Sequence, residues 1–87
     1  MTSRTQVPIT LPDLGTTRAV LSLWYVRSGD RVFAGDRVAE ILIPGATVDI
    51  PAPASGQLSE RLVLANDSVS PGQTLGMIEE ECESKNH

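Results

Sequence analysis

The sequence predicts an all-β domain, on three observations. Six prolines and seven glycines interrupt the chain so often that no window of a dozen residues keeps a clean helical period. Between these interruptions lie short runs rich in Val, Ile and Leu, which is the pattern of strands in a sandwich or barrel. The chain also resembles itself when it is shifted by 37 residues, which indicates two halves built on one plan.

The first half is expected to contain three main strands and one short strand. We place them at Pro8–Leu11, Ala19–Arg27, Arg31–Val32 and Arg37–Ile43. Glycine and aspartate mark the turns that separate the later strands, because glycine adopts positive φ and aspartate accepts hydrogen bonds from nearby backbone. These turns are Ser28-Gly29-Asp30 and Ala34-Gly35-Asp36.

Pro44-Gly45 is the sharpest turn signal in the chain. Proline presets φ for the first central position of a type II turn, and glycine accepts the positive φ of the second. Two β-rich runs flank this pair, so the sequence predicts a hairpin with Pro44-Gly45 at its tip. The tip falls at the junction between the two halves of the repeat.

The second half repeats the pattern of the first. Its strands are expected at Ala46–Ile50, Gln57–Leu64, Ser68–Val69 and Thr74–Ile78. Residues 54–66 form the best helical candidate, because Leu58 and Leu62 are spaced as in a helix. Gly56 lies near the start of this run, however, and the same leucines are compatible with a bent strand.

Seven identities in the 24 positions from Arg18 to Ile41 define the repeat. They are Leu21/Leu58, Ser22/Ser59, Val26/Val63, Asp30/Asp67, Val32/Val69, Gly35/Gly72 and Ile41/Ile78. Upstream, Ile9–Pro12 is similar to Val48–Pro51, now at a shift of 39. The repeat predicts two sheets related by a pseudo-twofold axis, since neither half is large enough to close a core alone.

Composition excludes several function classes. With 87 residues the chain has room for one core, and its net charge of −4 with 3% aromatic residues disfavours nucleic-acid binding. One cysteine, Cys82, excludes an internal disulfide framework and a cysteine-based zinc site. The single histidine is the last residue, His87. We therefore assign no catalytic residue and no metal ligand, and expect no enzymatic activity from the chain acting alone.

The start of the chain is polar and shows no secretory signal. The longest apolar stretches, Ala19–Val26 and Val38–Ile43, are far shorter than the ~20 residues that cross a bilayer as a helix. We therefore expect a cytoplasmic monomer that does not bind membranes.

Four carboxylates, two neighbouring aromatic residues and the cysteine could suggest chemistry, but each has a simpler structural interpretation. Asp30, Asp36, Asp49 and Asp67 fit turn and surface positions better than a metal site. Trp24 and Tyr25 adjoin in a strand, so one is expected to face the core and the other to be partly exposed. Glutamates flank Cys82, which raises the pKa of its thiol and makes it a poor nucleophile.

Several segments, in order and at matching spacing, resemble a known family. They are Pro12-Asp13-Leu14-Gly15, Trp24–Val32, Gly35-Asp36, Ala39-Glu40-Ile41, Ala46–Pro53 and Gly56. Together they resemble the lipoyl domains of 2-oxo acid dehydrogenase complexes, with the biotinyl domains of carboxylases as close relatives. The resemblance runs from Val7 to Glu79. It implies a flattened barrel-sandwich hybrid of two four-stranded sheets with internal pseudo-twofold symmetry.

The resemblance also implies an attachment lysine at the hairpin tip, within Asp-Lys-Ala, that carries lipoate through an amide bond. The matching tripeptide here is Pro44-Gly45-Ala46, so Gly45 stands where the family has lysine. Lys85 is the only lysine, and it follows the last strand. Arginine cannot replace lysine, because its guanidinium stays protonated. No cofactor, neither lipoate nor biotin, is expected at Gly45.

The loop after Leu14-Gly15 is also shorter than in lipoyl domains, where it helps a 2-oxo acid decarboxylase to recognise its own domain. Recognition of this chain by such a decarboxylase is therefore not expected. We divide the chain into a flexible N-terminus at residues 1–6, a lipoyl-like domain at 7–79 and an acidic flexible tail at 80–87.

Two functions remain open from the sequence. The first is a non-acylated module that binds a protein partner or serves as a scaffold. Its candidate contact residues are those of the tip, Leu42, Ile43, Pro44, Gly45, Ala46 and Thr47. The apolar residues among them either face a partner or pack on the adjoining sheet. The second is a carrier domain of a 2-oxo acid dehydrogenase or carboxylase complex.

Overall fold

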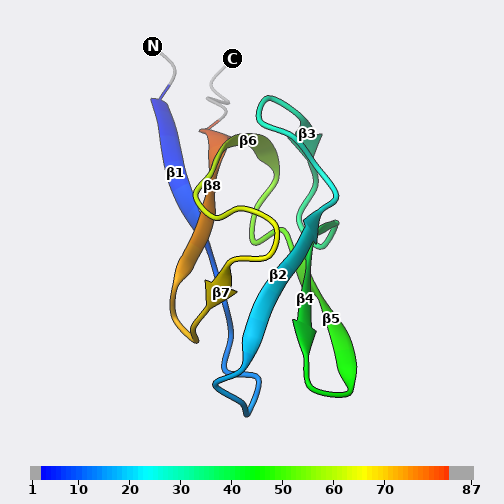
Figure 1. The fold of residues 1–87 in the computed structure, drawn as a ribbon. Helices are drawn as coiled ribbons and strands as arrows, with labels where there is room; N and C mark the ends of the chain where they lie inside the picture. The colour runs from blue at the N-terminus through cyan, green and yellow to red at the C-terminus, as the bar shows by residue number, and fades with distance from the viewer. Residues whose placement is uncertain (1–2, 83–87) are drawn as a thin grey trace.

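Two four-stranded antiparallel sheets make up the fold, as expected (Figure 1). The computed structural model describes the backbone of residues 3–82 and the side chains of residues 5–80. Within these bounds all the regular elements are strands, so there is no helix long enough to cross a membrane. The strands are β1 (Ser3–Thr10), β2 (Ala19–Trp24), β3 (Arg31–Val32), β4 (Arg37–Ile43), β5 (Ala46–Pro51), β6 (Gly56–Arg61), β7 (Ser68–Val69) and β8 (Thr74–Cys82).

The strand orders of the two sheets reveal the expected pseudo-twofold relation. Sheet A has the order β1-β8-β6-β3, and sheet B has the order β5-β4-β2-β7. Exchanging β1 with β5, β2 with β6, β3 with β7 and β4 with β8 converts one order into the other. The irregularities agree as well, because the β2–β4 register shifts between Leu21 and Leu23 and the β6–β8 register between Leu58 and Glu60.

The structure corrects one part of the predicted repeat. Val48 pairs with Ile41 in sheet B, and Val7 pairs with Ile78 in sheet A. Val48 is therefore equivalent to Val7 at a shift of 41, whereas the sequence pattern had aligned it with Ile9 at a shift of 39. Side chains alternate between faces with a period of two, so a two-residue slip leaves every apolar residue facing inward and the pattern cannot detect it.

The core lies between the two sheets. Leu21 pairs with Ile41 and Leu58 pairs with Ile78, and all four side chains are fully buried. The buried cluster consists of Ile9, Leu11, Ala19, Leu21, Val32, Val38, Ala39, Ile41, Ile50, Ala52, Leu58, Val63, Val69, Leu75 and Ile78. Burial of apolar surface of this kind is the main favourable contribution to folding.

The outer strands are longer than the sequence predicts. Residues 3–6 pair with residues 79–82, although residues 1–6 and 80–87 are predicted from the sequence to lie outside the domain. Once Val7 is in register with Ile78, the ladder continues through backbone hydrogen bonds that need no apolar side chain. The expected flexibility of residues 1–2 and 83–87 lies outside the described residues.

Two strands end earlier than predicted, and both for the same reason. Carboxylate oxygens of Asp30 and Asp67 accept hydrogen bonds from the backbone N–H groups of Arg27 and Leu64, each at 2.8 Å. These bonds draw the chain into turns just after β2 and β6. The structural role expected for Asp30 and Asp67 is thereby confirmed.

The two neighbouring aromatic residues divide as expected. Trp24 packs against the core, and its Nε1–H donates to the carbonyl of Val63 at 3.0 Å. The Tyr25 side chain is 43% exposed on the outer face of sheet B.

Candidate functional site

The β4–β5 hairpin projects at the lower end of Figure 1, with Pro44 and Gly45 at its tip. Ile43 pairs with Ala46, so the turn has two residues. Gly45 has φ of +81°, as the second central position of a type II turn requires. A side chain at this position would extend into open space, because a Cβ built on Gly45 meets no atom within 4 Å.

The six candidate contact residues differ in exposure. Leu42 is 48% exposed, and Pro44, Gly45, Ala46 and Thr47 are also exposed. Ile43 is half-buried and packs against the core. The packing alternative therefore holds for Ile43, whereas Leu42 faces outward and its contact with a partner stays a prediction.

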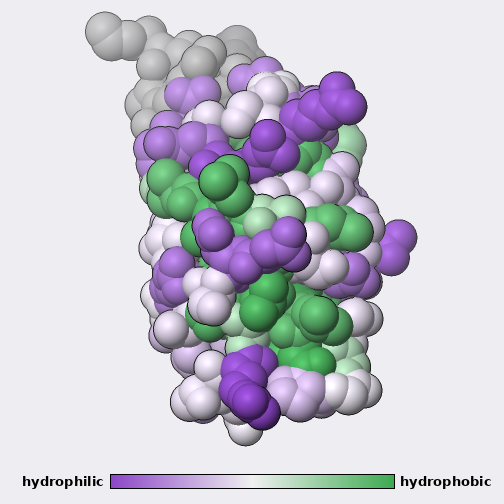
Figure 2. Space-filling model, viewed as in Figure 1, coloured by the Kyte–Doolittle hydropathy of each residue, from purple (hydrophilic) through white to green (hydrophobic). Residues whose placement is uncertain are grey.

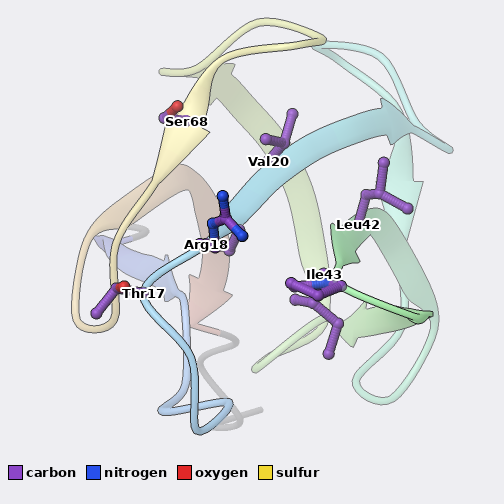
Figure 3. A pocket seen from close by; sticks show the side chains of 8 residues that line it. Thr17, Arg18, Val20, Leu42, Ile43 and Ser68 are labelled. Atoms are coloured by element: carbon purple, nitrogen blue, oxygen red, sulfur yellow. The ribbon is translucent and has the colours of Figure 1, made fainter.

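Leu42 also lines an open groove of about 430 Å³ on the outer face of sheet B. The groove lies between the loop that enters β2, the end of β4 and the strand β7, as Figure 3 shows. Its lining residues are Thr17, Arg18, Ala19, Val20, Leu42, Ile43, Pro44 and Ser68. In the space-filling view, hydrophobic surface gathers over the lower ends of β2 and β4, bordered by hydrophilic surface (Figure 2).

The sequence predicts the hairpin part of this groove but not its other lining residues, which are Thr17, Arg18, Ala19, Val20 and Ser68. These residues are distant from the tip along the chain, and strand pairing brings them beside it. Leu42 pairs with Val20, which in turn pairs with Ser68. The missed signal is Val20 itself, an apolar residue whose counterpart at the 37-residue shift is the polar Gln57.

A second, smaller groove of about 250 Å³ lies between the edge strands β1 and β5. It is lined by Pro8, Ile9, Thr10, Pro12, Ile50, Pro51 and Pro53. Proline has no backbone N–H to offer an incoming strand, and proteins use it to protect sheet edges. This groove is therefore better explained as a protected edge than as a binding site.

A polar cluster lies further along the outer face of sheet B. The Tyr25 hydroxyl donates to Asp49 at 3.0 Å, and the Arg37 guanidinium forms an ion pair with Asp49 at 3.4 Å while lying over the Tyr25 ring. Partial desolvation, the hydrogen bond to Asp49 and the negative charges of Asp49 and Glu40 raise the pKa of Tyr25. The Arg37 charge opposes this shift.

This cluster predicts an alkaline titration with a defined direction. Tyr25 is the single tyrosine, so tyrosinate absorbance reports on it alone. We expect a midpoint above that of the unfolded chain, a lower midpoint in Asp49→Ala and a higher one in Arg37→Gln. The stability linked to this proton is present below the ordinary tyrosine pKa and is lost as pH rises through the folded value. An unchanged midpoint in Asp49→Ala would contradict the assignment.

Attachment of lipoate or biotin requires a primary amine, and the residues of the tip do not supply one. Residues 42–47 are Leu-Ile-Pro-Gly-Ala-Thr. Arg18 is the only cationic residue that lines the groove, and its guanidinium is a poor acyl acceptor. The residues of the tip and the groove therefore include no primary amine, and they offer an apolar surface with one positive charge.

Comparison with known proteins places the fold and the family. The family model described as "Biotin-requiring enzyme" matches residues 7–78. The chain is 20% identical to the solved lipoyl domain of the 2-oxoglutarate dehydrogenase complex from Azotobacter vinelandii, with a TM-score of 0.67, covering 90% of this chain and 98% of that one.

Curated relatives of similar sequence are acyltransferase components. The chain is 30% identical over 73 residues to the dihydrolipoyllysine-residue succinyltransferase component of the 2-oxoglutarate dehydrogenase complex from Bartonella vinsonii subsp. berkhoffii, covering 82% of this chain. It is 32% identical over 74 residues to the dihydrolipoyllysine-residue acetyltransferase component of the pyruvate dehydrogenase complex from Cupriavidus necator, covering 84%. The chain spans 18% and 13% of these relatives. It therefore belongs to the biotin and lipoyl domain family and has the fold of a lipoyl domain.

Proposed function

We propose that the chain is a non-acylated, non-catalytic module of the lipoyl-domain type that binds a protein partner through its hairpin tip. One observation carries the proposal: the exposed two-residue turn at the position that resembles the family's attachment site consists of Pro44 and Gly45. The turn is presented to solvent in an open position, but it offers no side-chain nucleophile for acylation.

The family relationship supports a protein as the class of partner. The relatives are named as components of dehydrogenase complexes, which are multienzyme assemblies. A domain of this fold that carries no acyl group retains the surfaces through which it can associate with another protein. A carrier role for this chain is the competing function, and it requires a modified lysine.

Intact-mass measurement after co-expression with a lipoate ligase or a biotin ligase distinguishes the two functions. The unchanged chain is expected to gain no mass, and Pro44→Asp/Gly45→Lys is expected to gain one lipoyl or biotinyl group. The double change is needed because a lone lysine at φ of +81° would be strained by about 1–2 kcal/mol, whereas removal of Pro44 frees the turn to change type.

Two control variants locate any modification. Lys85→Arg removes the only native lysine, and Leu64→Lys places a lysine on an exposed position outside the tip. Any mass gain on the unchanged chain would overturn the non-acylated role. Lys85→Arg then shows whether the modified group is Lys85, because the gain disappears in this variant if it is. Failure of the double variant to gain mass, with Leu64→Lys equally unmodified, would show that the tip does not act as the family's attachment site.

A further inference from the structure

The two halves of the molecule provide an internal comparison for the outer face near the tip. In sheet B, paired residues form a row across four strands, in the order Thr47, Leu42, Val20 and Ser68. The pseudo-twofold axis relates it to a row in sheet A, in the order Gln6, Glu79, Gln57 and Arg31. The backbone positions are equivalent, but their chemistry is not.

This comparison shows that the fold itself does not require apolar residues on this face. Val20 has Gln57 as its counterpart, and Leu42 has Glu79. Sheet A has polar side chains at the same places, so apolar residues are not a general requirement of the fold at these positions. Leu42 is exposed and Val20 is half-buried, and apolar surface that lies open to solvent in this way is typical of an interaction site.

Charge at the groove indicates what kind of partner fits. Arg18 is the only charged residue that lines the groove, and among residues 5–80 no side chain forms an ion pair with its guanidinium. Its backbone N–H donates to Thr16 Oγ1 at 3.0 Å, which orders the loop beneath the exposed side chain. The counterpart of Arg18 in the other half is Ser55, so this charge is also peculiar to the groove.

A second copy of the chain does not complement this surface. A twofold-symmetric dimer places the same patch on both sides of the interface, which would bring two Arg18 side chains together with no carboxylate among the lining residues. Nucleic acid is disfavoured by the net charge of −4. A peptide segment with an apolar side chain beside a carboxylate matches both the apolar residues of the groove, Val20 and Leu42, and the guanidinium of Arg18.

We propose that this groove docks an acidic, apolar linear segment of a protein partner, with an apolar side chain on Val20 and Leu42 and a carboxylate paired with Arg18. The proposal rests on the proposed function, since it specifies the partner chemistry that the tip recognises. It also extends the contact surface from the hairpin to β2, β7 and the loop that enters β2.

The test is selection of random twelve-residue peptides displayed on phage against the immobilised chain, with counter-selection on Val20→Gln/Leu42→Glu. These substitutions introduce the residues that the other half carries at equivalent positions, so we expect the variant to fold, which its amide spectrum checks. We expect enriched peptides to combine an acidic and an apolar residue. The corresponding synthetic peptide is expected to shift the amide resonances of Val20, Leu42 and Ser68.

The arginine contact is tested by a double-mutant cycle. Arg18→Ser is expected to weaken binding of the selected peptide by about tenfold. Replacement of the peptide's acidic residue by its amide is expected to weaken binding by the same factor. Combining the two changes should add little further loss, because both remove one interaction. Gln57→Val, on the equivalent face of sheet A, serves as the matched control and should leave binding unchanged.

Four results would overturn the proposal: no enriched peptide, a consensus without an acidic residue, resonance shifts on another face, or full additivity in the cycle. A dimer in sedimentation that Leu42→Glu abolishes would identify a second copy as the occupant instead. The intact-mass experiment is read separately, so a modified chain would refute the non-acylated role without altering the peptide result.

Discussion

Gly56→Ala is expected to destabilise the domain by about 3 kcal/mol, because there is no space for a methyl group at this position. A Cβ on Gly56 would lie 2.2 Å from the backbone oxygen of Glu79 and 3.0 Å from Cα of Glu80. Both neighbours belong to β8, the strand that joins β1 to β6, and a backbone cannot move aside as a flexible side chain can. Thermal unfolding should report a decrease in Tm of ~15 °C.

The matched control for this variant is Ala19→Gly, at the equivalent position of sheet B. Ala19 is buried and begins β2 as Gly56 begins β6, so the two positions share their place in the strand. Removal of the Ala19 methyl group should cost only about 1 kcal/mol, mainly through backbone entropy. Equal losses in the two variants would show that the close approach of β8 does not determine the requirement for glycine.

Leu58→Ala is expected to reduce the free energy of unfolding by about 2–5 kcal/mol. Leu58 is completely buried, pairs with Ile78 and lies in the core between the sheets. Truncation removes apolar contacts and leaves a cavity that the surrounding β-sheets cannot easily fill. Chemical denaturation measures the loss as a shift in the midpoint.

Leu64→Ala provides the comparison at an exposed leucine in the same half of the chain. Leu64 is 70% exposed, so its truncation should change the stability by less than about 0.5 kcal/mol. A large loss at Leu64 would indicate that this side chain is covered in solution, whereas a small loss at Leu58 would mean that the core tolerates the cavity.

Local signals in the sequence predicted the strands and the tip of the hairpin. Pro44-Gly45 specifies its turn through the backbone preferences of two adjacent residues, so no distant contact is needed. The structure confirms the turn and the pairing of Ile43 with Ala46. The pseudo-twofold relation of the two sheets was predicted from the repeat at a shift of 37 residues, and the strand orders confirm it.

The groove could not be predicted in full from the sequence, because it depends on strand register. Arg18 and Ser68 reach the tip only through the pairing of β2 with β4 and β7. The predicted alignment of Ile9–Pro12 with Val48–Pro51 differs from the structural equivalence by two residues for a related reason, since alternation records which face a residue occupies but not its exact partner. Comparison of the halves position by position places Val20 and Leu42 among the apolar residues that have polar counterparts.

The pairing of the first strand with the last has a consequence for how this domain forms during synthesis. β1 pairs only with β8, and β3 pairs only with β6, so sheet A has no complete pair of strands until the later part of the chain has left the ribosome. Sheet B can begin earlier, because β2, β4 and β5 pair with one another and β5 ends at Pro51, before β6 begins. Pro8 has no backbone N–H, so it interrupts the row of hydrogen-bond donors along β1. This limits the pairing of β1 with other nascent chains before β8 has been synthesised.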